Sequence, residues 1–192
     1  MAMHLDVCNV NASSTIMKRL SINLFLTCLS CSVLSAEEYY IDSLHGDDAA
    51  AGTCPETAWS SLQAANQHAF KPGDVIYLHS GQIFDGQFRP ISSGADGQPI
   101  TLTSYMDGPK PVIAGHGLTR SAVFLENLSY WVIDGIEITN TGKSREAKRV
   151  GVLVFAKNIG LVQGITLRNL IVRDVNGVIS KSEGGGTGIR WE

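Results

Sequence analysis

Two stretches of the chain are copies of one short unit, and this repeat constrains the fold more than any other feature. They occupy residues 121–140 and 151–174. Each copy begins with a short apolar strand, turns at Asn127 or Asn158, and continues into a second strand rich in isoleucine and valine. The step between the copies is uneven, as expected when each turn of a solenoid carries its own loop. Such turns must stack on one another to bury their inward faces.

The alternation of side chains within each copy is typical of strands. In residues 131–139 apolar side chains occupy every second position, but the apolar side changes near Gly135. A bend or bulge at this glycine explains the change. Signals for two-residue hairpins are missing between the strands, which favours a parallel solenoid and leaves an antiparallel sandwich as the alternative. In the solenoid, Val123 and Leu125 pair in parallel with residues 152–155.

The N-terminal segment has the pattern of a secretory signal. Lys18 and Arg19 precede an apolar run at 20–29, and the small residues Ser35 and Ala36 precede two glutamates. The sequence therefore predicts an upstream segment and signal peptide over residues 1–36, with the signal at about 17–36, and a secreted or periplasmic protein. The apolar run is too short for a stable membrane span.

A helix is predicted near the start of the mature chain. Thr57 is suited to cap it, and Trp59, Leu62 and Ala65 recur at helical spacing before the stop at Pro72. We expect this helix to cover the first turn of the solenoid, with Trp59 packed on it, because an uncovered end exposes unpaired backbone groups.

The mature chain also resembles a known family over nearly all of residues 37–192. The motifs that carry the resemblance are YYIDS at 39–43, GDDAAAGT at 46–53, AWSSL at 58–62, KPGDVI at 71–76, GQPIT at 97–101, DGPKPVI at 107–113 and YWVIDG at 130–135. This pattern resembles the start of secreted right-handed parallel β-helix proteins of the pectate-lyase-like superfamily. The resemblance implies a carbohydrate-active protein, of polysaccharide-lyase type in our interpretation.

These observations together predict an all-β fold: a right-handed parallel β-helix, or solenoid, with a short N-terminal capping α-helix. The cap, a strand plus a helix, is expected over 37–73 and the first coils over 74–192. A third copy of the unit opens at 187–192. Because a solenoid needs several repeats and a terminal cap, we expect a fold truncated at its C-terminal end, an N-terminal fragment that is inactive alone.

Charge is distributed unevenly along the mature chain. Residues 37–142 hold 4 basic and 13 acidic side chains, whereas 143–192 hold 9 basic and 4 acidic ones. Basic residues concentrate in the loop between the two copies, which suggests a surface that binds an anionic polysaccharide, with a solvated loop tip as the alternative. The residues expected to bind substrate there are Lys143, Arg145, Lys148 and Arg149. Nucleic acid is not expected as a partner of a secreted chain with net charge −3.

A lyase reaction on such a polysaccharide makes definite demands. It needs a cation to neutralise the uronate carboxylate and a basic side chain to remove the adjacent proton. Arg173, Lys181 and Arg190 are the weak candidates for the catalytic base. Asp47 and Asp48 are weak candidates for binding Ca²⁺, with bracing of a turn as the alternative; no other cofactor is evident.

A hydrolase would instead need two carboxylates facing each other across the scissile bond, and the expected groove strands offer Glu126. Asn140 and Asp174 occupy matching places in the two copies, where we expect them to stabilise turns. The sequence thus favours a lyase-type enzyme on acidic polysaccharide. A non-catalytic β-helix that binds or builds structure at the cell surface is the alternative.

Overall fold

The structure is a computed structural model that describes residues 35–192, and residues 36–192 form one compact unit. The predicted signal peptide at 17–36 therefore lies outside the described residues, apart from its last two positions. Strands dominate the unit: β1 Glu38–Ile41, β2 Val75–His79, β3 Ile83–Asp85, β4 Ile100–Tyr105, β5 Val112–Ala114, β6 Ser121–Glu126, β7 Trp131–Asp134, β8 Glu137–Asn140, β9 Val150–Phe155, β10 Ile165–Arg168, β11 Ile171–Val175 and β12 Thr187–Trp191. Among residues 35–192, helical structure is limited to η1 Pro55–Thr57, α1 Leu62–Gln67 and η2 Lys181–Glu183.

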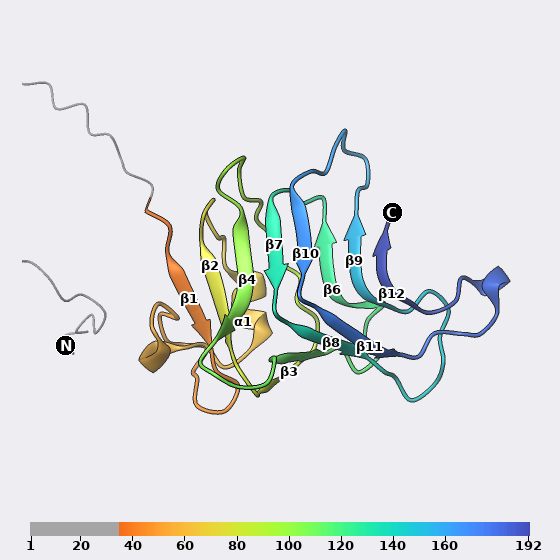
Figure 1. The fold of residues 1–192 in the computed structure, drawn as a ribbon, viewed down its shortest axis with the longest axis horizontal. Helices are drawn as coiled ribbons and strands as arrows, with labels where there is room; N and C mark the ends of the chain where they lie inside the picture. Colours follow the sequence, from red (N-terminus) through yellow and green to blue (C-terminus); the bar gives the residue numbers. More distant parts are fainter. Residues whose placement is uncertain (1–34) are drawn as a thin grey trace, which may run out of the picture. The chain divides into compact units, whose positions relative to one another are not determined.

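The strands form three sheets in which every named pair is parallel. Sheet A has the order β1-β2-β4-β7-β10, sheet B β3-β5-β8-β11 and sheet C β6-β9-β12. Figure 1 shows the strands of sheet A in the order of the sequence, from β1 at one end of the unit to β10. The expected all-β class is confirmed, and the antiparallel sandwich is wrong for the described residues.

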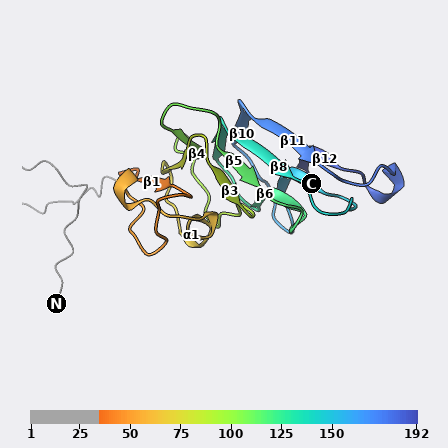
Figure 2. The ribbon, with the colours of Figure 1, turned by 90° about the horizontal axis from the view of Figure 1, so that it is seen from below.

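The chain visits the three sheets in a fixed order. It passes from β4 in sheet A to β5 in sheet B and β6 in sheet C, and repeats this with β7, β8, β9 and again with β10, β11, β12. We call each such passage a circuit; Figure 2 shows the strands of sheet B from successive circuits side by side. The predicted pairing is confirmed, since Val123 lies beside Val152 and Leu125 beside Val154, in parallel.

Left-handed residues turn the chain between sheets. Gly135 separates β7 from β8 with φ 74°, and Asn169 takes its place in the next circuit with φ 53°. The bend predicted at Gly135 is thus confirmed, and it explains why the apolar side changes there. Asn127 and Asn158, which close the first strand of each copy, both have φ 57°. Asparagine and glycine are the residues that tolerate this conformation best.

The core lies between the three sheets and is filled by one side chain from every second strand position. Its largest fully buried side chains include an aromatic group and aliphatic residues from each sheet: Trp131, Phe84, Phe88, Ile41, Leu62, Ile76, Leu78, Ile100, Leu102, Ile113, Leu125 and Ile133. Phe88 precedes sheet C in sequence and joins it through an isolated parallel bridge to Val123. Outward positions of the same strands are left to form the surfaces described below.

The capping helix begins later than the sequence suggested. Ser61, rather than Thr57, is its N-cap, and the Ser61 hydroxyl accepts a hydrogen bond from the Gln63 N–H at 3.2 Å. Thr57 instead ends the short η1 turn, because Pro55 at its start favours a separate tight turn. The Trp59 ring is buried and stacks on Tyr39 of β1 with centroids 5.3 Å apart.

Asn140 stabilises turns, as predicted. Its side chain is fully buried at the end of β8. The amide oxygen accepts from the Gly117 N–H at 2.8 Å, and the amide nitrogen donates to the carbonyls of Thr119, Arg120 and Val150. One side chain therefore joins the loop before β6 to the strand β9 of the next circuit.

A polar cleft beside sheet B as the candidate functional site

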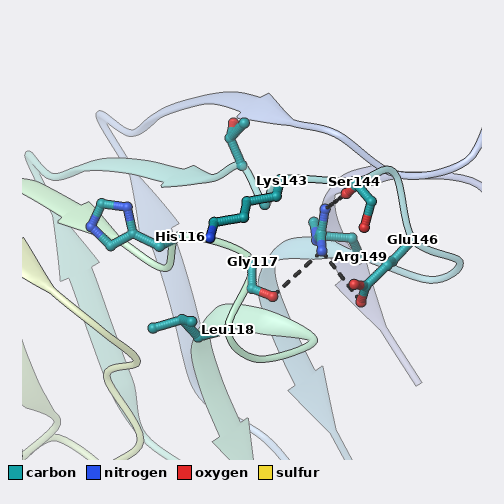
Figure 3. A pocket seen from close by; sticks show the side chains of 9 residues that line it. His116, Gly117, Leu118, Lys143, Ser144, Glu146 and Arg149 are labelled. Atoms are coloured by element: carbon teal, nitrogen blue, oxygen red, sulfur yellow. Dashed lines mark hydrogen bonds and ion pairs between the residues drawn. The ribbon is translucent and has the colours of Figure 1, made fainter.

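Two connections from sheet B to sheet C lie side by side and enclose a cleft of about 520 Å³. One is the β5–β6 connection and the other the β8–β9 connection, at equivalent places in successive circuits. Figure 3 shows the side chains around it. The cleft is lined by His116, Gly117, Leu118, Thr141, Gly142, Lys143, Ser144, Glu146 and Arg149.

A second hollow of about 490 Å³ continues the cleft across the outer face of sheet B. It shares His116 and Thr141 with the cleft. Its other lining residues come from all four strands of the sheet: Ile83, Val112, Ala114, Thr139, Arg173 and Asp174. The two hollows together have the volume expected of a ligand site, and polar side chains such as Thr141, Lys143 and Ser144 line the part near the loops.

A histidine–carboxylate pair marks the junction of the two hollows. The His116 Nε2 lies 2.6 Å from the Asp85 Oδ1, and both side chains are exposed. His116 has φ 52°, in the left-handed region. An exposed imidazole can donate or accept hydrogen bonds, so this pair suits the recognition of ligand hydroxyl groups. Sequence reasoning missed the pair because its members are 31 positions apart and no motif joins them.

The basic residues predicted to bind substrate have different surroundings. Lys143 is exposed and extends toward His116 in Figure 3, and its ammonium group makes no ion pair with any described residue. Arg145 is also exposed, but its guanidinium donates to the Gly177 carbonyl at 3.0 Å. Lys148 is exposed outside the cleft lining, with φ 59° and its aliphatic chain near Gly184. Lys143 is thus the basic residue of this cluster best placed to contact a ligand.

Arg149 is buried, with a side-chain exposure of 2%. Its guanidinium donates to the carbonyls of Ser144 at 2.6 Å, Asn176 at 3.3 Å and Gly117 at 3.4 Å, and pairs with Glu146 at 3.3 Å. These contacts, several of them drawn in Figure 3, join three successive loops. The side chain therefore forms the back of the cleft and offers its donors to the protein backbone.

The proposed catalytic bases do not converge. Arg173 of β11 donates to Glu137 at 2.7 Å and also pairs with Asp174, and these two carboxylates raise its pKa. A raised pKa lowers the population of the neutral guanidine, which is the form that could accept a proton. Arg190 lies on sheet C, where its Nε is 2.7 Å from the Glu192 Oε1. The side chain of Lys181 lies outside the described part of the structure.

Sheet C presents a second set of charged residues on its outer face. Glu126 pairs with Arg89 at 2.5 Å, and the Arg89 guanidinium lies 5.1 Å from the centre of the Phe124 ring. Glu192 is held between Arg120 and Arg190, each 2.7 Å away. These salt bridges leave no open pair of carboxylates on this face among residues 35–192.

Asp48 braces a turn of the N-terminal cap. Its Oδ1 accepts the N–H groups of Ser60 at 2.8 Å and Ser61 at 2.9 Å, and its Oδ2 accepts the Ser61 hydroxyl at 2.6 Å. Partial burial alone would raise the pKa of Asp48. The hydrogen bonds from Ser60 and Ser61 outweigh this effect and hold the pKa below its usual value. Asp47 accepts the Ala49 N–H at 2.9 Å. Within the described chain no three acidic, histidine or cysteine side chains are grouped for a metal ion, and Ca²⁺ binding at these aspartates stays a prediction.

Comparison with known proteins points to glycoside hydrolases. No family model matches the chain. It is similar to the lacto-N-biosidase of Bifidobacterium longum subsp. longum, with 31% identity over 197 aligned positions that cover 76% of this chain and 12% of that protein. Two crystal structures of the GH136 lacto-N-biosidase from Eubacterium ramulus, native and selenomethionine derivative, match with TM-scores of 0.72 and 0.70. Both are 30% identical and cover 81% of this chain and 30% of the solved chain, so this chain spans less than a third of the relatives that it matches.

These findings correct two expectations. The assignment to the pectate-lyase-like superfamily is wrong, because the similar proteins are lacto-N-biosidases. The expected lyase reaction on an acidic polysaccharide is contradicted for the same reason, and the non-catalytic alternative is not better supported. The sequence motifs that suggested lyases describe the start of a parallel β fold, which unrelated activities share. No helix of the described residues is long and apolar enough to cross a membrane.

Proposed function

We propose that this chain forms the N-terminal part of a glycoside hydrolase that acts on a neutral oligosaccharide containing lacto-N-biose. The similarity to lacto-N-biosidases from two organisms over more than three quarters of the chain carries the proposal. We propose further that the circuits are successive coils of a right-handed parallel β-helix, whose three faces are sheets A, B and C. The regular order of sheets A, B and C along the chain supports this arrangement.

The cleft beside sheet B is proposed to bind sugar units. A neutral oligosaccharide offers many hydroxyl groups and no charge, so its recognition needs several separate donors and acceptors. The cleft supplies them through His116, Thr141, Lys143 and Ser144. Its carboxylate, Glu146, is held by Arg149 at 3.3 Å, and Asp174 in the adjoining hollow is held by Arg173.

The described residues are proposed to shape and bind rather than to cleave. A glycoside hydrolase needs one protonated carboxyl group and one free carboxylate on opposite sides of the scissile bond, about 5–10 Å apart. The carboxylates that line the two hollows, Glu146 and Asp174, are each paired with an arginine, so this lining offers no open pair of carboxylates. We therefore assign the chemistry to other parts of the whole protein.

Hydrolysis of a chromogenic glycoside tests the proposal. The natural protein that carries this chain should release p-nitrophenol from p-nitrophenyl lacto-N-bioside and should produce no unsaturated sugar from polygalacturonate. In the same assay Lys143→Ala should raise KM about tenfold with kcat nearly unchanged, since a binding contact worth about 1.4 kcal/mol is removed.

Lys157→Ala is the matched control, because Lys157 is equally exposed but lies outside the cleft lining. Its KM should equal that of the natural protein. Absence of p-nitrophenol release would overturn the assignment to hydrolases. Release with an unchanged KM for Lys143→Ala would remove the cleft from the substrate site.

A further inference from the structure

Three of the five tyrosines in the chain lie together on the outer face of sheet A. They are Tyr40 of β1, Tyr77 of β2 and Tyr105 of β4, on the three neighbouring strands nearest the N-terminal end of the unit in Figure 1. The Tyr40 and Tyr77 rings are nearly parallel with centroids 5.1 Å apart. The Tyr105 ring stands almost perpendicular to Tyr40, with centroids 5.2 Å apart. We call this group the tyrosine platform.

The platform is not part of the core. Its residues alternate with the inward side chains of the same strands, such as Ile41 and Ile76, which are fully buried. The three tyrosine rings are only half-buried, and Met106 beside them is 67% exposed. Contact between water and the apolar surface of grouped aromatic rings is unfavourable, and exposed patches of this kind commonly mark binding surfaces.

Polar groups border the rings. Glu38 accepts the Tyr40 hydroxyl at 2.7 Å and the Tyr77 hydroxyl at 3.3 Å. The Tyr105 hydroxyl makes no hydrogen bond to any residue from 35 to 192. His79, whose ring centroid is 4.9 Å from that of Tyr105, has its Nδ1 2.8 Å from the Ser80 carbonyl. Because a carbonyl only accepts, this Nδ1 carries the proton, and the Nε2 of the neutral ring is left as an acceptor.

This combination matches the chemistry of an uncharged sugar. A pyranose has an apolar C–H face that packs on aromatic rings and a rim of hydroxyl groups that donate and accept hydrogen bonds. Tyrosine supplies rigid contact area at a small cost in side-chain entropy, and its hydroxyl reaches the polar rim. The platform offers a free hydroxyl at Tyr105 and a carboxylate at Glu38.

The charges around the platform exclude anionic ligands. Burial, followed by the negative charges of Asp42 and Glu56, raises the pKa of Tyr105 to about 12. The phenol therefore stays a hydrogen-bond donor at neutral pH. A uronate or sulfated glycan, like an anionic membrane surface, would be repelled by these carboxylates and by Glu38.

We infer that the tyrosine platform is an accessory binding surface for a neutral oligosaccharide, on a different sheet from the cleft. The juxtaposition of three half-exposed tyrosine rings with an unpaired hydroxyl and an acceptor carboxylate carries the inference. It extends the proposed function, but sugar binding at the platform requires no hydrolysis, so the two proposals can fail separately.

Retention of the whole natural protein on beads that carry lacto-N-biose tests the inference. Tyr77→Ala should weaken retention about tenfold while p-nitrophenol release from the soluble glycoside keeps its rate. Tyr130→Phe is the matched control, since Tyr130 contacts Gln163 away from the platform, and its retention should equal that of the natural protein. Beads carrying polygalacturonate should retain none of the proteins through the platform.

If folded Tyr77→Ala protein is retained on the lacto-N-biose beads as well as the natural protein, the inference is overturned. It is also overturned if the natural protein is retained on polygalacturonate beads and Tyr77→Ala abolishes that retention. If Tyr77→Ala fails to fold, as judged by its thermal melt, Glu38→Gln decides, because Glu38 is exposed and its loss leaves the rings in place. Glu38→Gln should weaken retention severalfold, and an unchanged value overturns the inference. Failure of the proposed function appears separately, as absence of p-nitrophenol release.

Discussion

The circuit formed by β7, β8 and β9 and the next one, formed by β10, β11 and β12, contain the same pattern of residues but bury it to different extents. Ile133 of β7 lies in register between Leu102 of β4 and Leu167 of β10 and is fully buried. Leu167 has a neighbour only on the β7 side within the described sheet and is half-buried. On sheet C, Trp191 of β12 is 57% exposed, whereas its register partner Val154 is buried. Alternation therefore sets the direction of a side chain, and the presence of neighbours on both sides sets its burial.

Truncation of the paired core residues should give the largest effect. Ile133→Ala is expected to lower the free energy of unfolding by about 2–5 kcal/mol, because it leaves a cavity in a fully packed site. Leu167→Ala should cost clearly less, since this side chain is only partly buried. Urea denaturation of the whole protein, followed by circular dichroism, measures both. Equal losses would show that β10 is covered in solution by a further part of the protein.

Truncation of a polar side chain near the end of β8 should also lower the stability more than truncation of one near the end of β11. Asn140→Ala removes the side-chain partner of one N–H and three carbonyl groups in a buried site, so we expect a loss of about 1–3 kcal/mol. Asp174 is not the structural counterpart of Asn140 that the sequence suggested, because Asn140 is in register with Val175 across a bulge at Asp174. Asp174→Ala in the next circuit should cost less than about 1 kcal/mol because its carboxylate is exposed. The same denaturation experiment compares them. A larger loss for Asp174→Ala would contradict the comparison.

The smallest expected effect concerns acid stability of the N-terminal cap. Hydrogen bonds hold the pKa of Asp48 below its usual value against the opposing effect of burial. At pH values above about 3.9, the pKa of an aspartate in the unfolded chain, the charged Asp48 carboxylate stabilises the folded state. This contribution disappears as the pH falls through the lower pKa that Asp48 has in the folded protein. Asp48→Asn should therefore destabilise the protein at pH 7 by less than about 1 kcal/mol, and by less still at pH 3.

Thermal melts at the two pH values measure this difference. Asp47→Asn is a suitable control, because the Asp47 carboxylate accepts one hydrogen bond, from the Ala49 N–H. A loss for Asp48→Asn that grows as the pH falls would contradict the assignment of the hydrogen bonds.

The parallel fold was predictable because its signals are local. Repetition of one unit, alternation within it, and a glycine or asparagine at each change of sheet determined the strands and the pairing of Val123 with Val152. The start of the helix was predicted wrongly, since Thr57 and Ser61 are both good caps and only the Pro55 turn decides between them.

The site was less predictable because it depends on contacts between circuits. Sequence placed Lys143 and Arg149 in one basic cluster, yet the chain buries the Arg149 guanidinium among loop carbonyls and leaves Lys143 exposed. The tyrosine platform also escaped notice, since its rings are separated by 28 to 65 positions and meet only through the register of sheet A. The activity was predicted wrongly because the motifs report the fold and not the chemistry.

The buried arginine of the cleft has a consequence for how this protein can change in evolution. A methyl group added at Gly117 would approach the Gly142 backbone to 2.3 Å and the Arg149 guanidinium to 2.8 Å, and one added at Gly142 would approach that guanidinium to 2.6 Å. Neither glycine can therefore be replaced while the arginine stays, and a shorter side chain at 149 would leave both loops without their common donor. We expect the three positions to vary together among homologues, so that the two cleft loops are inherited as one unit.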